Sequence, residues 1–163
     1  MIIEESTITE TSDFRVIIYP ASRPFTAKEA KIITEKIFDF LPTWAAHGKQ
    51  LTSSFKIVKN QFVIISVDEE KEAASGCSID SLGQIFRELD SDFQLGFFDR
   101  MKASFVENGE VKTMKLQEFR TALKNGELSE NIEVFDFSKD TYVNFLSDFC
   151  LPLKRSWAGI FLK

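Results

Sequence analysis

The sequence predicts an α+β fold with a ferredoxin-like βαββαβ core, an antiparallel sheet and a C-terminal α/β extension. One reason is the order strand, helix, strand, strand, helix, strand, which the hydrophobic patterns give through residue 106. Another is that 163 residues with 44% hydrophobic content suit one packed domain with an appendage. We expect a frayed segment over residues 1–13, the core over 14–115, and the extension packed on that core over 116–163.

The first strand and helix have clear boundaries. Phe14 to Tyr19 is a mostly apolar run that Pro20 ends, which is typical of a strand. Thr26 precedes Glu29 by three residues, which is the spacing of a helix capping box. The apolar residues that follow recur at helical spacing: Ala30, Ile33, Ile37, Phe40 and Leu41.

A hairpin and a second helix are predicted next. Residues 51–57 alternate apolar with polar side chains, which predicts a half-buried strand. A turn at Asn60-Gln61 leads into residues 62–68, which are almost continuously apolar and predict a central strand. A helix with Ser78 as its N-cap follows. Its apolar face carries Ile79, Leu82, Ile85, Phe86, Leu89 and Phe93.

The remaining elements complete the predicted sheet and build the extension. Residues 95–106 predict a long fourth strand, and Asn108-Gly109 is a strong hairpin signal. Within the fourth strand, Asp99 and Arg100 would point to opposite faces, so the one facing the helices would need a partner. The later predicted elements are a strand over 111–115, a helix over 116–124, a strand over 132–137, a short helix over 141–149 and an apolar tail that docks on the core.

Charge and composition argue against several classes of partner. The net charge is −5 with an isoelectric point near 5.0, and no basic stripe is present, so we expect neither nucleic acid nor an anionic membrane as a partner. No signal peptide or spanning segment is visible. Two distant cysteines, Cys77 and Cys150, do not form a disulfide framework, which favours a cytoplasmic protein with reduced thiols.

Phenylalanine is unusually frequent, with 17 residues against two tyrosines and two tryptophans. One interpretation is a bulky aromatic core, because phenylalanine is commonly buried. The alternative is an exposed patch that closes a homo-oligomer.

The predicted topology brings two loops together. In a ferredoxin-like unit, the end of the first helix and the start of the second lie at the same edge of the sheet. The lone histidine, His47, would then lie near Cys77, and Asp68 and Asp80 would belong to the same cluster. A thiol before a helix, a base and a carboxylate resemble a nucleophilic site, with Cys77 as nucleophile, His47 as base and an aspartate as orienter.

Other interpretations of the turn remain open. Ser75, Gly76 and Ser78 surround a helix N-terminus, where backbone N–H groups attract a phosphate or carboxylate. They equally suit an ordinary capped helix beside a packed thiol. His47, Cys77 and the two aspartates include possible zinc ligands, but they show no metal-binding spacing, so we expect no metal and no other cofactor.

A nucleotide-binding loop is not encoded. The Gly48-Lys49 pair is followed by Gln50, and Thr43 stands where the motif needs its first glycine.

Several segments together resemble a family of small uncharacterised bacterial proteins that often carry the label "ABC transporter ATPase". The resemblance covers residues 14–130, and it rests on Trp44–Gly48, Phe55–Phe62, Val67–Glu69, Ser75–Asp80 and Phe98–Arg100. It implies no established activity, and the label conflicts with the missing phosphate-binding loop.

Two functions follow as hypotheses. The first is a small binding module without ATPase activity, whose partner is a small anion or a protein, including a second copy of the chain. The alternative is a small thiol-dependent enzyme that uses Cys77 with His47 and an aspartate.

Overall fold

The computed structural model describes residues 13–162, so the predicted frayed segment lies almost entirely outside the described residues. The α+β class is confirmed. The strands are β1 (Arg15–Pro20), β2 (Ala45–Ala46), β3 (Lys49–Gln50), β4 (Ser53–Val58), β5 (Phe62–Val67), β6 (Lys102–Glu107), β7 (Glu110–Lys115), β8 (Glu133–Phe135) and β9 (Cys150–Pro152). The α-helices are α1 (Ala27–Phe40), α2 (Gly76–Phe93), α3 (Leu116–Lys124) and α4 (Tyr142–Asp148), and the 3₁₀ helices are η2 (Leu41–Thr43), η3 (Leu153–Arg155) and η4 (Trp157–Leu162).

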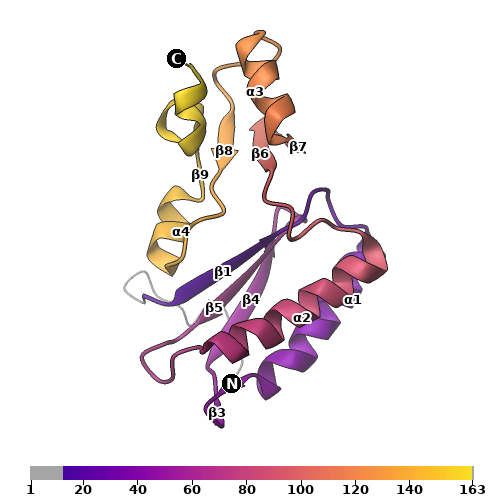
Figure 1. Cartoon of the computed structure of the whole chain (residues 1–163), viewed down its shortest axis with the longest axis vertical. Helices are drawn as coiled ribbons and strands as arrows, with labels where there is room; N and C mark the ends of the chain where they lie inside the picture. Colours follow the sequence, from indigo (N-terminus) through magenta and orange to yellow (C-terminus); the bar gives the residue numbers. More distant parts are fainter. Residues whose placement is uncertain (1–12, 163) are drawn as a thin grey trace.

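The first sheet has the strand order β1-β5-β4, and both pairings are antiparallel. The helices α1 and α2 lie together along one side of it (Figure 1). The predicted central strand is confirmed, because β5 lies in the middle of the sheet and is buried along its whole length. One face of β5, with Val63, Ile65 and Val67, packs in the core under the two helices.

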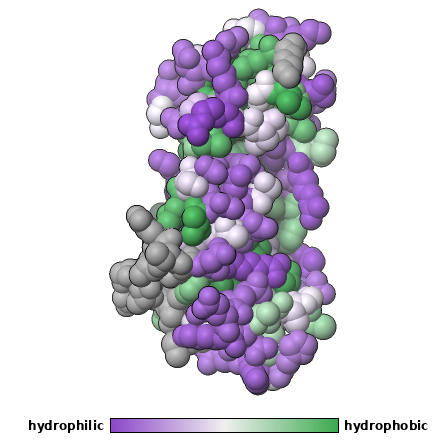
Figure 2. Space-filling model, turned by 90° about the vertical axis from the view of Figure 1, so that its left-hand side faces the viewer, coloured by the Kyte–Doolittle hydropathy of each residue, from purple (hydrophilic) through white to green (hydrophobic). Residues whose placement is uncertain are grey.

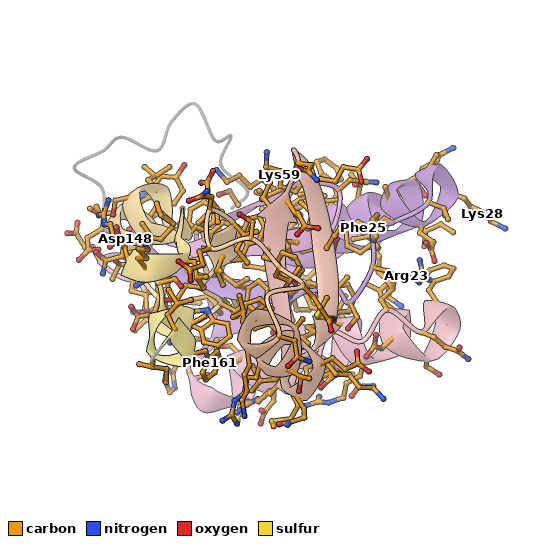
Figure 3. The ribbon with its side chains drawn as sticks, turned by 90° about the horizontal axis from the view of Figure 1, so that it is seen from above. Arg23, Phe25, Lys28, Lys59, Asp148 and Phe161 are labelled. Atoms are coloured by element: carbon orange, nitrogen blue, oxygen red, sulfur yellow. The ribbon has the colours of Figure 1, made fainter. Side chains whose placement is uncertain are left out.

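The capping box of α1 is confirmed. The Glu29 N–H donates to Thr26 Oγ1 at 3.1 Å, and the Thr26 N–H donates to Glu29 Oε1 at 2.9 Å. The same carboxylate accepts two hydrogen bonds from Arg23, both at 2.8 Å. Arg23 also donates to the carbonyl oxygen of Phe93 at 2.7 Å, and it lies between α1 and α2 in Figure 3. The first turn of α1 is thus tied to the last turn of α2.

The N-cap predicted for α2 is wrong by three residues. The helix begins at Gly76, so its N-cap is Ser75, and Ser78 occupies the third helical position. The two serines form a reciprocal capping box, in which the Ser78 N–H donates to Ser75 Oγ at 3.1 Å and the Ser75 N–H donates to Ser78 Oγ at 2.7 Å. Two serines three residues apart were the signal for the earlier start.

The predicted fourth strand does not join the first sheet. Residues 94–101 form a connection instead, because the Asp90 carboxylate accepts the backbone N–H groups of Leu95 and Gly96 at 3.0 and 2.7 Å. The strand begins only at Lys102, and β6 pairs with β7 and β8. The complete four-stranded ferredoxin-like sheet is therefore not confirmed. The predicted boundary between core and extension, after residue 115, cuts through the second sheet, because it separates β6 and β7 from the later strands β8 and β9.

The second sheet has the strand order β7-β6-β8-β9. A core that includes Phe105, Phe119 and Leu153 joins this sheet to α3 and to the segment from η3 to η4. The predicted helix over 116–124 is confirmed, and the apolar tail packs on the protein as expected. In Figure 1 the second sheet and its helices stand above the first sheet, which makes the molecule elongated.

An aromatic layer joins the two sheets. The face of the first sheet that points away from α1 and α2 contributes Val16, Phe62 and Ile64. Phe135 at the end of β8 and Phe149 after α4 belong to the same layer, and their ring centroids lie 4.7 and 5.6 Å from that of Phe62. We name this cluster the inter-sheet layer.

The phenylalanines mostly fill these cores, as one of the two interpretations predicts. Phe38 and Phe98 are exposed, with 58% and 43% of their surface accessible. On the face shown in Figure 2, apolar surface is broken into patches among polar residues.

Tight hairpin turns connect several strands. Asn108-Gly109 is confirmed as a turn, with φ of 52° and 79°. The turn between β4 and β5 is Lys59-Asn60, one residue before the predicted position. His47 and Gly48, with φ of 53° and 76°, form a turn of the same kind between β2 and β3. Positive φ at both central residues is the type I′ geometry that fits the twist of hairpins.

Candidate functional site

The structure places the segment before His47 beside the start of α2, as the predicted topology requires. The indole nitrogen of Trp44 donates a 2.7 Å hydrogen bond to the backbone oxygen of Ser78, and both residues are buried. The short strand β2 contacts α2. The antiparallel pairing of β4 with β5 favours this arrangement, because it puts the start of β4, which follows the His47 hairpin, and the end of β5, which precedes α2, at the same end of the sheet.

The residues of the predicted nucleophilic site are not joined to one another by hydrogen bonds within residues 13–162. His47 lies at the tip of its hairpin turn and is exposed, and Cys77 is exposed on the first turn of α2. Within residues 13–162, no hydrogen bond links the two side chains. The Asp68 carboxylate accepts the Glu70 N–H at 3.2 Å, and Asp80 is exposed on α2. The catalytic roles of these four residues stay predictions without a contact to support them.

The hydroxyl groups of the predicted anion site form hydrogen bonds within the site itself. Ser75 and Ser78 satisfy one another through the capping box, and Ser78 Oγ also donates to the Ser75 oxygen at 2.8 Å. Gly76 is exposed and has open space around its Cα. Over the described part of the chain, no group of three or more histidine, cysteine, aspartate or glutamate side chains is arranged to hold a metal ion.

A cleft of about 540 Å³ lies elsewhere, along the outer edge of β1. We name it the β1 cleft. Its walls come from β1, α2, the connection before β6 and the segment after β8. The residues that matter below are Ile18, Tyr19, Asp80, Arg87, Phe98 and Arg100. Among the described strands, β1 is the last strand on this side of the first sheet, and β6 joins the second sheet instead, which leaves space along this edge.

The edge of β1 is closed at both ends of the cleft. At one end the Val16 N–H donates to the Asp140 oxygen at 2.8 Å, and at the other the Lys102 ammonium donates to the Pro20 oxygen at 2.6 Å. Ile18 lies between them. Its N–H and C=O point the same way as those of Val16, because alternate residues of a strand share an orientation. No described residue makes a hydrogen bond to these two groups from the cleft side.

Tyr19 has a buried ring and an accessible hydroxyl in the wall of the cleft. Only 7% of the residue is exposed, and its ring stacks in parallel on that of Phe86 with centroids 3.6 Å apart. Burial raises the pKa of Tyr19 to about 12, and the charge of Arg87 opposes this shift. The phenol is therefore protonated at neutral pH. Its hydroxyl makes no hydrogen bond with any residue between 13 and 162.

Two arginines supply positive charge to the cleft. The Arg87 guanidinium lies 5.5 Å from the ring centroid of Phe98, and Arg100 follows in the connection before β6. In the described part of the chain, neither arginine forms an ion pair with an acidic side chain. Asp80 and Asp99 also line the cleft, so its charge is mixed.

Lys102 forms the closed end of the cleft. Its ammonium donates to the oxygens of Pro20 and Gly96, both at 2.6 Å, and to Ser22 Oγ at 3.0 Å. Burial lowers the pKa of Lys102 to about 8, and the charges of Asp99 and Asp90 oppose this shift. Because its three donors are already used, Lys102 positions the connection before β6 instead of binding a ligand.

The sequence did not indicate Tyr19 or Arg87. Of the residues that line the cleft, the sequence analysis singled out Asp80, as part of another site, and Asp99 and Arg100, which were assigned to a strand that is a loop in the structure. The useful signal was the pair Phe97-Phe98 directly before these charges, which is typical of a surface that combines aromatic and polar groups.

Comparison with models of protein families, with curated proteins and with solved structures found no match. Among the described residues, no helix has the length and apolar character that crossing a membrane requires.

Proposed function

We propose that the protein is a non-catalytic binding module whose β1 cleft holds a small anionic ligand with an apolar body. The observation that carries this proposal is the Tyr19 hydroxyl, which is accessible in the wall of the cleft, makes no hydrogen bond with any described residue and lies beside the unpaired Arg87. This keeps the predicted class of function and moves the site from the start of α2 to the edge of β1.

The energetics favour an acceptor at this position. A hydrogen bond from the Tyr19 hydroxyl to a ligand oxygen replaces one to water, so its net gain is about 0.5–1.5 kcal/mol. Hydrogen bonds to a charged oxygen are about twice as strong as neutral ones, so a carboxylate or phosphate gains most from a hydroxyl beside a guanidinium. Phe97, Phe98 and Ile17 offer apolar surface for the body of the ligand. The cleft volume is within the usual range for small-molecule sites.

We also infer that β1, α1, β4, β5 and α2 form a ferredoxin-like unit without its fourth strand. Two features support this inference: the β1-β5-β4 order with antiparallel neighbours, and the two helices along one side of the sheet. The vacant edge is then the natural place for a ligand.

A titration with small probes tests the proposal. Benzoate and phenyl phosphate carry an anion on an apolar ring, and benzamide is the neutral counterpart. We expect both anions to shift the backbone NMR signals of Tyr19 and Arg87 and to bind about tenfold more tightly than benzamide, which corresponds to about 1.4 kcal/mol.

Variants show whether the binding belongs to the β1 cleft. Tyr19→Phe and Arg87→Ala should each weaken the anions, and Arg87→Ala should leave benzamide unaffected. Arg120→Ala is the matched control, because Arg120 is also exposed and lies 5.0 Å from the ring centroid of Phe161, in the second half of the protein. Equal binding of benzamide, unchanged affinity in both cleft variants, or no binding at millimolar concentration would contradict the proposal.

A further inference from the structure

We propose that the ligand of the β1 cleft is the C-terminal end of a peptide chain, which adds to β1 at Ile18. This inference rests on the proposed function and names its ligand class. It draws on one feature that the proposed function does not use, namely the open backbone of Ile18.

Ile18 needs a ligand that both donates and accepts. Its N–H and C=O face the cleft without a partner in the described part of the chain. An extended peptide parallel to β1 offers one C=O as acceptor for the Ile18 N–H and the next N–H on the same side as donor for the Ile18 C=O, which is how extended peptides add to the edge of a sheet. A simple aromatic acid has only acceptors, so it leaves the Ile18 carbonyl oxygen unsatisfied.

The space at this edge suits a chain end. The hydrogen bonds that Val16 and Pro20 make to Asp140 and Lys102 close the edge on both sides of Ile18. A long strand would have to break one of these contacts. A chain that ends inside the cleft and leaves the edge of β1 before Val16 breaks neither, and its terminal carboxylate can accept hydrogen bonds from Tyr19 and Arg87.

The charges along α2 set the direction of the peptide. Asp80 and Arg87 both line the cleft, and the seven-residue separation places them about 10 Å apart along the helix axis. The connection between β5 and α2 returns the chain, so α2 runs in the same direction as β1. A carboxylate beside Arg87 therefore implies a peptide that runs parallel to β1, with its N-terminal side toward Asp80.

Three matched peptide libraries test this inference on the full-length protein. Each contains acetylated tetrapeptides of the same random composition. The first has free C-terminal carboxylates, the second has C-terminal amides, and the third has free carboxylates with the last peptide nitrogen methylated. We expect members of the first library to bind, and the amide and N-methyl forms of the same peptides to bind at least about tenfold more weakly.

Two further measurements locate the peptide. Hydrogen exchange of the Ile18 amide should slow when the best free-acid peptide is bound, while exchange of the Val16 amide, which is already bonded to Asp140, should not change. Arg87→Ala should weaken that peptide about tenfold, and Arg120→Ala should leave its affinity unchanged.

The outcomes separate the two proposals. If benzoate binds in a manner that depends on Tyr19 and Arg87, but no free-acid peptide binds more tightly than benzoate, the peptide inference is wrong and the proposed function stands. Equal binding of the N-methyl library would also overturn the added strand. If neither benzoate nor any peptide binds, both proposals are wrong.

Discussion

The Lys102 ammonium nitrogen lies 2.6 Å from the Pro20 carbonyl oxygen, and this contact joins the first residue of β6 to the last residue of β1. The same nitrogen holds the Gly96 oxygen at 2.6 Å. One buried side chain therefore links the two sheets and sets the position of the connection that ends the β1 cleft.

Replacing Lys102 should weaken both the fold and the cleft. Lys102→Met keeps the length of the side chain but leaves the Pro20 and Gly96 oxygens without their donor, so we expect the free energy of unfolding to fall by about 1–3 kcal/mol in urea denaturation. Lys112→Met is the control, because Lys112 pairs with Glu107 at an exposed position and should contribute little. Equal losses in the two variants would show that the link does not stabilise the protein.

A side chain at Gly96 should be poorly tolerated. Gly96 has φ of 72°, and a Cβ atom there would collide with the Ser22 hydroxyl. Gly109 has φ of 79° but open space around it, so Gly109→Ala measures the backbone strain alone. We expect Gly96→Ala to cost about 1–2 kcal/mol more than Gly109→Ala in thermal or urea unfolding, because the connection before β6 must shift. Similar costs would mean that Ser22 moves aside freely.

Acid should weaken the link between α1 and α2. Hydrogen bonds from Arg23 hold the pKa of Glu29 at about 2, below its usual value of 4.5, although partial burial opposes the shift. A carboxylate with a lower pKa in the folded state stabilises the protein fully above the unfolded pKa. That stabilisation is lost as the pH falls from 4.5 toward 2.

Glu29→Gln tests this dependence. The carboxylate side chain is only 9% exposed, so we expect the variant to lose about 1–3 kcal/mol at neutral pH and to show a flatter loss of stability between pH 4.5 and 2. Glu88→Gln removes a more exposed ion pair with Lys36 and serves as the control. A wild-type slope in the Glu29 variant would assign the acid sensitivity to other groups.

The two cysteines should differ in reactivity. Cys77 is exposed, whereas Cys150 is half-buried and burial raises its pKa to about 11. Iodoacetamide near pH 8 should therefore modify Cys77 first and reach Cys150 chiefly in unfolded protein, which mass spectrometry of timed samples can follow. Because no hydrogen bond joins Cys77 to His47, His47→Ala should leave the rate at Cys77 unchanged. A clear drop in that rate would revive the thiol-enzyme hypothesis.

Local signals in the sequence predicted the first half of the fold well. The capping box at Thr26 and Glu29, the buried run that became β5, and the Asn108-Gly109 turn each depend on residues close together in the chain. These features need no knowledge of distant contacts. The errors in this half were a turn shifted by one residue, a helix start shifted by three, and the short β2-β3 hairpin, which was not predicted.

Local signals in the sequence could not predict where the fourth strand begins or which strand it pairs with. The apolar run from Leu95 suggested a strand. In the structure, the Asp90 carboxylate accepts hydrogen bonds from the N–H groups of Leu95 and Gly96, and Gly96 turns the chain at positive φ. Whether β6 then pairs with β1 or with β8 depends on packing between distant residues, which no local window contains. The β1 cleft is a product of that choice. Tyr19 and Arg87 therefore gave no signal as a pair, although the structure places them together.

The inter-sheet layer has a consequence for dissecting the protein. Phe62 and Ile64 on one side, and Phe135 and Phe149 on the other, cover each other. A fragment that stops after α2 would expose its side of the inter-sheet layer to water, and a fragment that starts at β6 would expose the opposite side. Each piece would tend to aggregate when made separately, whereas the two expressed together have the complementary surfaces to reassociate.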